Sequence, residues 1–307
     1  MKVEKLKDGK KLTKSMGLIL IVMISFFPLT VLGAENNYQM ILWKGTENYK
    51  IITYDKEGWE KNIGTALEPE DIFGKNSDEE DAESKYTIRA IYESDWSLID
   101  LISSTILGNL VIPIILINYT PTELDKEFSE EYELWYGLQS RWKYTLDEFE
   151  YEPDIEAEKH PFIKDPNDFG DILEEYNDLA QELNNTFMPE LNGDDFLWYL
   201  LISHIGIPDP VEKYLDEMVE ILDSKDAEVN SNTITLERSE KEDIIVEVVY
   251  TSQGIIESIK FKDTDEDIFY EIQHFNDRWV VYTILGIISV FIIGLTVYAF
   301  RRKKNLR

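Results

Sequence analysis

The stretch 244-IIVEVVYTSQGIIESIKFK-262 predicts two antiparallel strands joined by a tight turn. β-branched residues dominate both arms, and residues 251–254 (TSQG) have the composition of a hairpin connection. Ile244–Tyr250 is apolar on both alternating faces over most of its length, which is typical of a strand with covered neighbours. We therefore expect this stretch to lie centrally in an antiparallel sheet.

Two flanking runs extend this hairpin into a four-strand meander. Thr233–Arg238 precedes it and Ile268–Gln273 follows it, with Asp263–Asp267 as a second turn. Asp263, Asp265 and Asp267 occupy positions 1, 3 and 5 of an EF-hand loop, but Ile268 and His274 stand where the motif needs Gly and Glu. The acidic run is therefore predicted to be a hairpin turn and not a calcium loop.

The N-terminal part of the chain repeats the strand pattern. Tyr38–Trp43 and Tyr49–Tyr54 are rich in aromatic and β-branched residues and predict an opening hairpin, and Tyr86–Tyr92 alternates as a further strand. Between them, residues 68–85 hold eight acidic residues and no apolar periodicity. This acidic segment is predicted to be a solvated loop.

The middle of the chain carries helical signals. Thr120, Pro121 and Glu123 form a capping box ahead of apolar residues at spacings of four and three, which predicts a helix from Pro121 to Leu138. Its apolar stripe consists of Leu124, Phe128, Tyr132, Trp135 and Leu138.

Three more helices are predicted downstream. Pro166–Asn184 carries one continuous apolar stripe, and Phe196–Ile205 is apolar on nearly every face, as in a helix covered on all sides. Asp209, Pro210 and Glu212 repeat the capping pattern ahead of an apolar stripe from Val211 to Leu222.

Leu101–Ile117 is free of charge but is short for a membrane span and contains Gly108 and Pro113. A crossing there would also reverse the orientation that the two ends of the chain predict. We interpret it as a buried strand or helix pair of the core, with an apolar surface against a bilayer or a lipid-sized cavity as the alternative. The predicted fold class is thus α+β: an antiparallel sheet, made of an N-terminal hairpin and a C-terminal four-strand meander, covered by three or four central helices.

One transmembrane helix is expected after this domain. Val280–Phe300 is uncharged and long enough to span about 30 Å of hydrocarbon, and Arg301, Arg302, Lys303 and Lys304 follow it directly. Residues 279–300 are therefore predicted to cross the membrane, with residues 301–307 as a basic cytoplasmic tail.

The N-terminus agrees with this orientation. Six lysines precede the apolar stretch Leu18–Leu32, and Gly33 and Ala34 follow it, so residues 1–34 have the layout of a signal peptide, with an uncleaved anchor as the alternative. Residues 35–278 are then exported, and the protein is predicted to be a single-pass protein of the cell membrane with its main domain outside.

The predicted exported region is strongly acidic. Between residues 35 and 278 it holds 59 Asp and Glu against 19 Lys and Arg, a formal charge of about −40. Such a field disfavours nucleic acid as a partner and leaves a basic protein or a cation as candidates beside the membrane itself. The chain has no cysteine, which excludes disulfides and thiol chemistry and suits a domain large enough to fold without them.

No residue can be assigned to catalysis, to a cofactor or to a metal from the sequence. His160 precedes Pro161 in an expected loop, His204 closes the apolar helix and His274 lies near the predicted membrane span, so the three histidines share no ligand spacing. The sequons at Asn118 and Asn184 are compatible with glycosylation outside the cell.

In layout the chain resembles uncharacterised archaeal surface proteins, including those of the Asgard group. The resemblance rests on the order of leader, acidic cysteine-free ectodomain, single C-terminal span and Arg-Arg-Lys-Lys tail, and on the phrase 248-VVYTSQGII-256. It implies an archaeal membrane location and carries no catalytic residue. A second likeness is to exported lipoprotein-carrier sheets, in which strands curl around a lipid under a lid of helices.

These features predict a membrane-anchored surface domain that acts as a binding or structural interaction module. The alternatives are a carrier of a lipid or another apolar ligand and a membrane-tethered hydrolase. An enzyme is the less favoured class, because a hydrolase needs a convergent site that the sequence does not display.

Overall fold

A computed structural model describes residues 29–32, 38–42, 46–65, 67–103, 131–147, 152–183, 188–203, 205–239 and 241–275. The elements in chain order are β1 (Leu29–Leu32), β2 (Gln39–Leu42), β3 (Thr46–Tyr54), α2 (Lys56–Asn62), α3 (Pro69–Phe73), β4 (Glu83–Ser97), α4 (Leu98–Ser103), β5 (Glu131–Trp142), β6 (Pro153–Ile163), α7 (Asp168–Glu182), α8 (Gly193–Ile202), α9 (Val211–Ile221), β7 (Ala227–Asn230), β8 (Thr233–Ser239), β9 (Asp243–Tyr250), β10 (Ile256–Asp263) and β11 (Ile268–Phe275).

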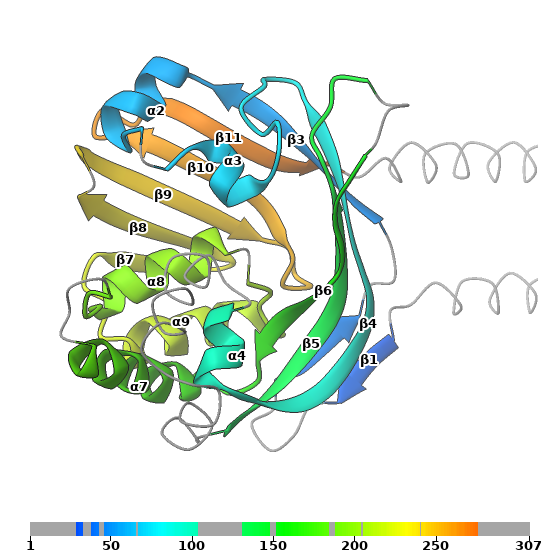
Figure 1. The fold of residues 1–307 in the computed structure, drawn as a ribbon, viewed down its shortest axis with the longest axis vertical. Helices are drawn as coiled ribbons and strands as arrows, with labels where there is room; N and C mark the ends of the chain where they lie inside the picture. Colours follow the sequence, from blue (N-terminus) through cyan, green and yellow to red (C-terminus); the bar gives the residue numbers. More distant parts are fainter. Residues whose placement is uncertain are drawn as a thin grey trace, which may run out of the picture.

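A nine-stranded antiparallel sheet organises the fold, in the order β6-β5-β4-β3-β11-β10-β9-β8-β7. The sheet curves strongly, and helices α4, α7, α8 and α9 lie inside the curve (Figure 1). Strands β1 and β2 form a separate two-stranded ribbon. The predicted α+β class with a large antiparallel sheet is therefore confirmed.

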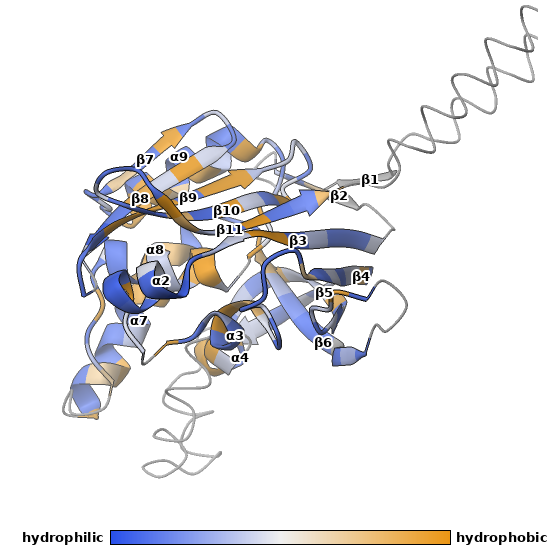
Figure 2. Ribbon diagram, turned by 90° about the horizontal axis from the view of Figure 1, so that it is seen from above, coloured by the Kyte–Doolittle hydropathy of each residue, from blue (hydrophilic) through white to orange (hydrophobic). Residues whose placement is uncertain are grey.

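The predicted four-strand meander is confirmed as β8, β9, β10 and β11, and β7 adds a strand that the sequence did not predict. Figure 2 shows apolar and polar residues alternating along β8, β9 and β10. The inward residues of β9 are buried, including Val246 and Val248. β9 lies in the interior of the sheet as expected, although β11 is the middle strand because β3 to β6 extend the sheet on the far side.

Aromatic side chains fill the core where the meander meets the helices. The Phe261 ring lies 5.3 Å from the Trp59 ring and 5.9 Å from both the Trp198 and Tyr270 rings, and Phe73 stacks on Tyr270 at 5.0 Å. These five side chains are essentially inaccessible to solvent. Rings of this size supply much of the hydrophobic stabilisation of a domain.

The three helices predicted between residues 166 and 222 are confirmed. α7 buries the stripe that includes Phe169, Ile172 and Tyr176, and α8 is buried on nearly all sides, as its composition predicted. The capping detail at α9 is wrong. Its N-cap is Pro210 without a side-chain hydrogen bond, because the Asp209 backbone pairs instead with Gln39 of β2.

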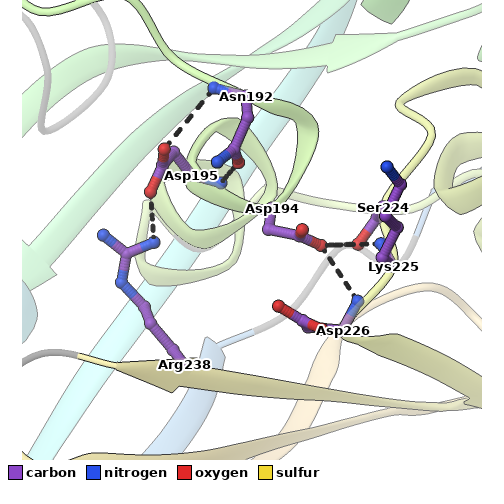
Figure 3. A network of polar contacts seen from close by, with 7 residues as sticks. All are labelled: Asn192, Asp194, Asp195, Ser224, Lys225, Asp226 and Arg238. Atoms are coloured by element: carbon purple, nitrogen blue, oxygen red, sulfur yellow. Dashed lines mark hydrogen bonds and ion pairs between the residues drawn. The ribbon is translucent and has the colours of Figure 1, made fainter.

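A polar network fastens the start of α8 to the meander (Figure 3). Asp194 accepts hydrogen bonds from the Ser224 hydroxyl and from the backbone N–H groups of Lys225 and Asp226, the last two at 3.0 and 3.2 Å. Asp195 caps the helix together with Asn192 and also accepts a hydrogen bond from Arg238 of β8 at 2.9 Å. The contacts marked there cap α8 or join it to β8 and to the segment before β7, so we assign this network a structural role.

The predicted opening hairpin is wrong. Tyr38–Trp43 does not pair with Tyr49–Tyr54, since β2 pairs with β1 while β3 lies between β4 and β11. Both edges of β3 are occupied by strands distant in sequence, so no backbone groups remain for β2. β1 itself belongs to the segment predicted as a leader.

The predicted helix from Pro121 to Leu138 is wrong where the structure describes it, because Glu131–Trp142 is strand β5. Tyr132, Leu134 and Tyr136 point to one face, and Trp135 packs on the other with Phe162 of β6. The same aromatic residues fit a helical spacing and an alternating one, and pairing with β4 and β6 selects the strand.

The acidic segment 68–85 is ordered and is not a simple loop. It contains α3, whose N-terminus carries a reciprocal capping box between Glu68 and Asp71. Ile72, Phe73 and Ala82 are buried against the main core. These few apolar residues anchor a segment whose acidic residues otherwise face solvent.

Several predictions lie outside the described residues. These are the cleavage site at Gly33 and Ala34, the greater part of Leu101–Ile117, the sequons, His204, and everything after residue 275. Within the described ranges α4 does bury Leu101 and Ile102, and no described helix has the length and apolarity needed to cross a membrane.

Candidate ligand-binding site

A partly open cavity of about 70 Å³ lies against strands β3 to β6. One row of its lining follows the register of the sheet. Glu47 of β3 is opposite Tyr86 of β4, and Tyr86 is opposite Arg141 of β5. Opposite charges therefore stand two strands apart on one face, with a tyrosine between them.

Strand alternation explains why these side chains share a face. Glu47 and Tyr49 are two residues apart on β3, and Ser84, Tyr86 and Ile88 follow the same period on β4; all five line the cavity. The polar members of this row lie beside apolar residues of the main core, because Phe73, Tyr144 and Ile256 line the same cavity.

Glu47 is paired with a histidine on the neighbouring strand. Its Oε2 lies 2.5 Å from Nε2 of His274 of β11, and both side chains are only 11% exposed. Because a carboxylate accepts hydrogen bonds, Nε2 carries the hydrogen in this contact. The His274 ring also packs against the Tyr49 ring at 5.5 Å in an edge-to-face arrangement.

Arg141 supplies the positive charge of the site. Its Nη2 lies 3.3 Å from Oδ2 of Asp154 on β6, and the backbone of Gly74 packs closely against the guanidinium. Its Nε is buried and has no hydrogen-bond partner in the described part of the chain. An unpaired buried donor costs about 1–3 kcal/mol, so its retention calls for an explanation.

The tyrosines of the site are neutral hydrogen-bonding groups. Burial raises the pKa of Tyr49 and of Tyr86 well above the ordinary value. The Tyr49 hydroxyl donates to the carbonyl of Ile256 at 3.0 Å, and the Tyr86 hydroxyl donates to Oε1 of Gln139 at 3.1 Å. Both therefore remain protonated at neutral pH and are suited to orient a ligand.

Most of the remaining wall is apolar, and its shape depends on two glycines. Residues 205–206 pass so close to β6 that a Cβ on Gly206 would lie 1.9 Å from the Phe162 ring. Gly254 has a φ of +74° in the turn before β10, and its carbonyl accepts a hydrogen bond from Ile207 at 3.0 Å. The two segments thus meet at the cavity and complete its wall.

A second, smaller cavity of about 40 Å³ adjoins the first and shares Ile205 with it. Its remaining lining is apolar and comes from α4, β6, α7 and α8. A cavity for an acyl chain is expected to measure several hundred Å³, so the volumes of these two cavities suit a small molecule better than a lipid.

A third depression is larger, at about 280 Å³, but more open. It is lined by Trp96, Asp100 and Lys159, among others, and the Lys159 ammonium lies over the Trp96 ring at 5.4 Å. The neighbouring Tyr92 is 48% exposed and stacks on Tyr136 at 5.4 Å. This surface lacks the enclosed pair of opposite charges that distinguishes the first cavity.

The histidines have different surroundings from those that the sequence indicated. His160 is buried in β6 and lines the cavity, not a loop, and its ring packs against Phe162 at 5.0 Å. Among the described residues, no group of three or more His, Asp or Glu side chains could hold a metal ion. The Asp263 turn is a hairpin turn as predicted, and its carboxylate accepts from the N–H groups of Asp265 and Asp267.

The arrangement is suited to binding more than to nucleophilic catalysis. The Ser84 hydroxyl in the cavity donates to the carbonyl of Trp142 at 2.5 Å, so its proton is directed at the backbone and not at a base. Sequence reasoning missed Glu47 and Arg141, which are two among many charged residues. Only the strand register brings them together.

Comparison of the chain with protein-family models, with curated proteins and with solved structures finds no match. The function is therefore inferred from the cavity.

Proposed function

We propose that this protein is a membrane-anchored binding module whose exported domain captures a small ligand in the cavity between Glu47 and Arg141. The leader at residues 1–34 and the apolar run Val280–Phe300 support the membrane anchor. Opposite charges facing a largely apolar cavity support the binding role, because convergent polar groups in an apolar concavity are the general mark of a ligand site.

The observation that carries the proposal is the incomplete pairing of these charges. Arg141 contacts Asp154 through one terminal nitrogen, while its Nε has no described partner. Glu47 contacts His274 through one of its two oxygens. A fold that needed these charges only for stability would gain by replacing them with apolar residues, since buried ion pairs seldom stabilise more than good packing.

A cavity-filling variant tests the binding role. Full-length protein in detergent would be screened by thermal unfolding and native mass spectrometry against small metabolites. Ile91→Phe replaces an aliphatic side chain of the cavity wall with a larger aromatic ring. Ile99→Phe makes the same change at a half-buried site of α4 outside both cavities. We expect Ile91→Phe to abolish ligand-induced stabilisation and Ile99→Phe to retain it. Equal retention by both variants would exclude the cavity as the site.

A protease experiment tests the anchor and the orientation. Protease added to intact cells or spheroplasts should remove residues 35–278 and leave a tag placed after Arg307 protected. Digestion of that tag from outside would overturn the proposed topology.

A further inference from the structure

We infer that the ligand is a zwitterionic α-amino acid with a small aliphatic side chain, an inference that rests on the proposed binding function. Its ammonium group would bind Glu47 and its carboxylate would bind Arg141. The side chain would lie against the apolar wall that includes Ile88 and Phe162.

The register gives a suitable span between the charges. Glu47 and Arg141 are each opposite Tyr86 on adjacent strands, so their Cα atoms are about 10 Å apart, twice the separation of paired strands. Both side chains extend from the same face, and a ligand whose two charged groups are attached to one carbon atom fits between their ends. The Tyr86 side chain extends from the same face between Glu47 and Arg141.

Each protein charge keeps unused hydrogen-bonding capacity on the described part of the chain. His274 contacts Oε2 of Glu47, and a carboxylate has a second oxygen, Oε1, that can accept from an ammonium group. Asp154 contacts Nη2 of Arg141, and a guanidinium offers five donors in a planar fork that matches a carboxylate. A ligand carboxylate would therefore compensate the guanidinium more fully than Asp154 does alone.

The charge balance favours a zwitterion over a simple ion. An anion would face both Glu47 and the strongly negative charge of residues 35–278, while a cation would face Arg141. A zwitterion pairs with both groups and carries no net charge into the field of the protein. Two opposite protein charges in one cavity thus select for a ligand that has both.

The cavity volume limits the side chain of the ligand. About 70 Å³ accommodates roughly five water molecules, at about one probe sphere each. The close approach of Gly206 to Phe162 closes one side. Only a small amino acid suits this space, with part of a valine side chain extending through the open side of the cavity, and tryptophan or arginine exceed it.

The test compares valine with analogues that each lack one charge. Full-length protein in detergent is titrated by calorimetry with L-valine, with valinamide, whose carboxylate is masked, and with 3-methylbutanoate, which has no amino group. We expect L-valine to bind at least tenfold more tightly than either analogue, because each lost charge-assisted contact leaves a protein charge unpaired.

Two variants assign the contacts. Glu47→Gln should reduce the preference for L-valine over 3-methylbutanoate at least tenfold, and Arg141→Gln should do the same for the preference over valinamide. Arg89→Gln and Glu228→Gln, at exposed positions of β4 and β7, are the matched controls and should leave both ratios unchanged. Circular dichroism establishes whether each variant is folded. If a variant does not fold, the titrations of the wild-type protein with valine and its two analogues still decide the question.

Binding of either analogue as tightly as L-valine would overturn the inference. If alanine and valine both fail to bind while another ligand binds wild-type protein and is lost in Ile91→Phe, the zwitterion assignment is wrong and the proposed function stands. If no compound binding to the cavity is found in the screen and L-valine is also inert, both fail.

Discussion

Two regions of the sheet are built differently. One is the meander, taken here with its added strand β7 as β7 to β11, and the other is the wing, which we define as strands β4 to β6. Strands of the meander connect through short turns and cover an aromatic core that includes Trp198 and Phe261. The wing consists of longer strands, and it buries polar residues such as Gln139, Ser140 and His160. The cavity lies where the wing meets β3.

This difference indicates a division of labour within the sheet. The meander buries its inward residues tightly, which stabilises the domain. The wing retains buried charged groups and borders the cavity, and both features lower the stability of a fold. Destabilising features of this kind are concentrated at functional sites in proteins. Four predictions test this contrast, beginning with the largest expected effect.

Removing a buried aromatic ring should lower the free energy of unfolding more in the meander than in the wing. Phe261→Ala should reduce the free energy of unfolding by about 3–5 kcal/mol, because the ring is fully enclosed by other aromatic side chains. Phe162→Ala should cost about 1–2 kcal/mol less, since part of the Phe162 ring faces the existing cavity. Denaturant unfolding measures both, and equal losses would contradict the contrast in packing.

The polar network of the meander side should be stabilising. Asp194→Ala removes the acceptor of three hydrogen bonds at the start of α8 and should cost about 2 kcal/mol. Asp216→Ala, at an exposed position of α9, is the control and should change stability by less than about 0.5 kcal/mol. A loss no greater than that of the control would show that solvent replaces these bonds freely.

The third prediction concerns Asp168, at the start of α7. Its carboxyl group should destabilise the fold as the pH rises. Burial, together with Asp165, Asp171 and Glu133, raises the pKa of Asp168 to about 6. The protonated group is favoured on folding, so its contribution is complete below about pH 4 and is lost as the pH passes 6.

Asp168→Asn should therefore raise the free energy of unfolding at pH 8 by about 1 kcal/mol, a value reduced for partial solvent screening, and should change it little at pH 4. Asp171→Asn, in the same helical turn but exposed, is the control. Thermal unfolding at the two pH values measures the effect, and stabilisation at pH 4 alone would reverse the sign.

Glu247, on β9 of the meander, should show the opposite pH dependence. Its ionised carboxylate should stabilise the fold. Partial burial raises the pKa of Glu247, but hydrogen bonds from Lys260 and Lys262, at 2.8 and 2.6 Å, outweigh it and leave the pKa below its ordinary value. Its stabilisation is present above about pH 4.5 and is lost as the pH falls further.

Glu247→Gln should accordingly reduce the free energy of unfolding by about 0.5–1 kcal/mol at pH 7 and by less at pH 3, as is typical of an ion pair that solvent still reaches. Glu271→Gln on β11 is the control, because Glu271 forms no ion pair within the described part of the chain. An equal cost at both pH values would mean that packing, not charge, is what the substitution removes.

Local pattern was sufficient for the meander and for the three downstream helices. In Ile244–Tyr250 the alternation of β-branched residues and the short turn that follows act over a few residues, so the pairing partner is the next strand. In α7 the stripe through Phe169, Ile172 and Tyr176 has one helical face and no competing period.

Local pattern was misleading where two periods fit the same residues or where partners are distant. Tyr132, Trp135 and Leu138 match a helix, while Tyr132, Leu134 and Tyr136 match a strand, and only the neighbours β4 and β6 decide. The hairpin expected near Tyr49 failed because β11, from the other end of the domain, occupies that edge of β3.

By itself, the sequence determined the α+β class, the meander, the three helices between residues 166 and 222, and the strong negative charge. It also supplies the prediction of a C-terminal span at Val280–Phe300. These follow from short-range periodicity and from composition, which folding does not alter. The cavity was decided by tertiary structure alone, because Glu47, Arg141 and His274 are ordinary charged and polar residues until the register of β3, β5 and β11 places them on one face. Strand pairing across long stretches of chain is a property of the whole fold, and no local pattern encodes it.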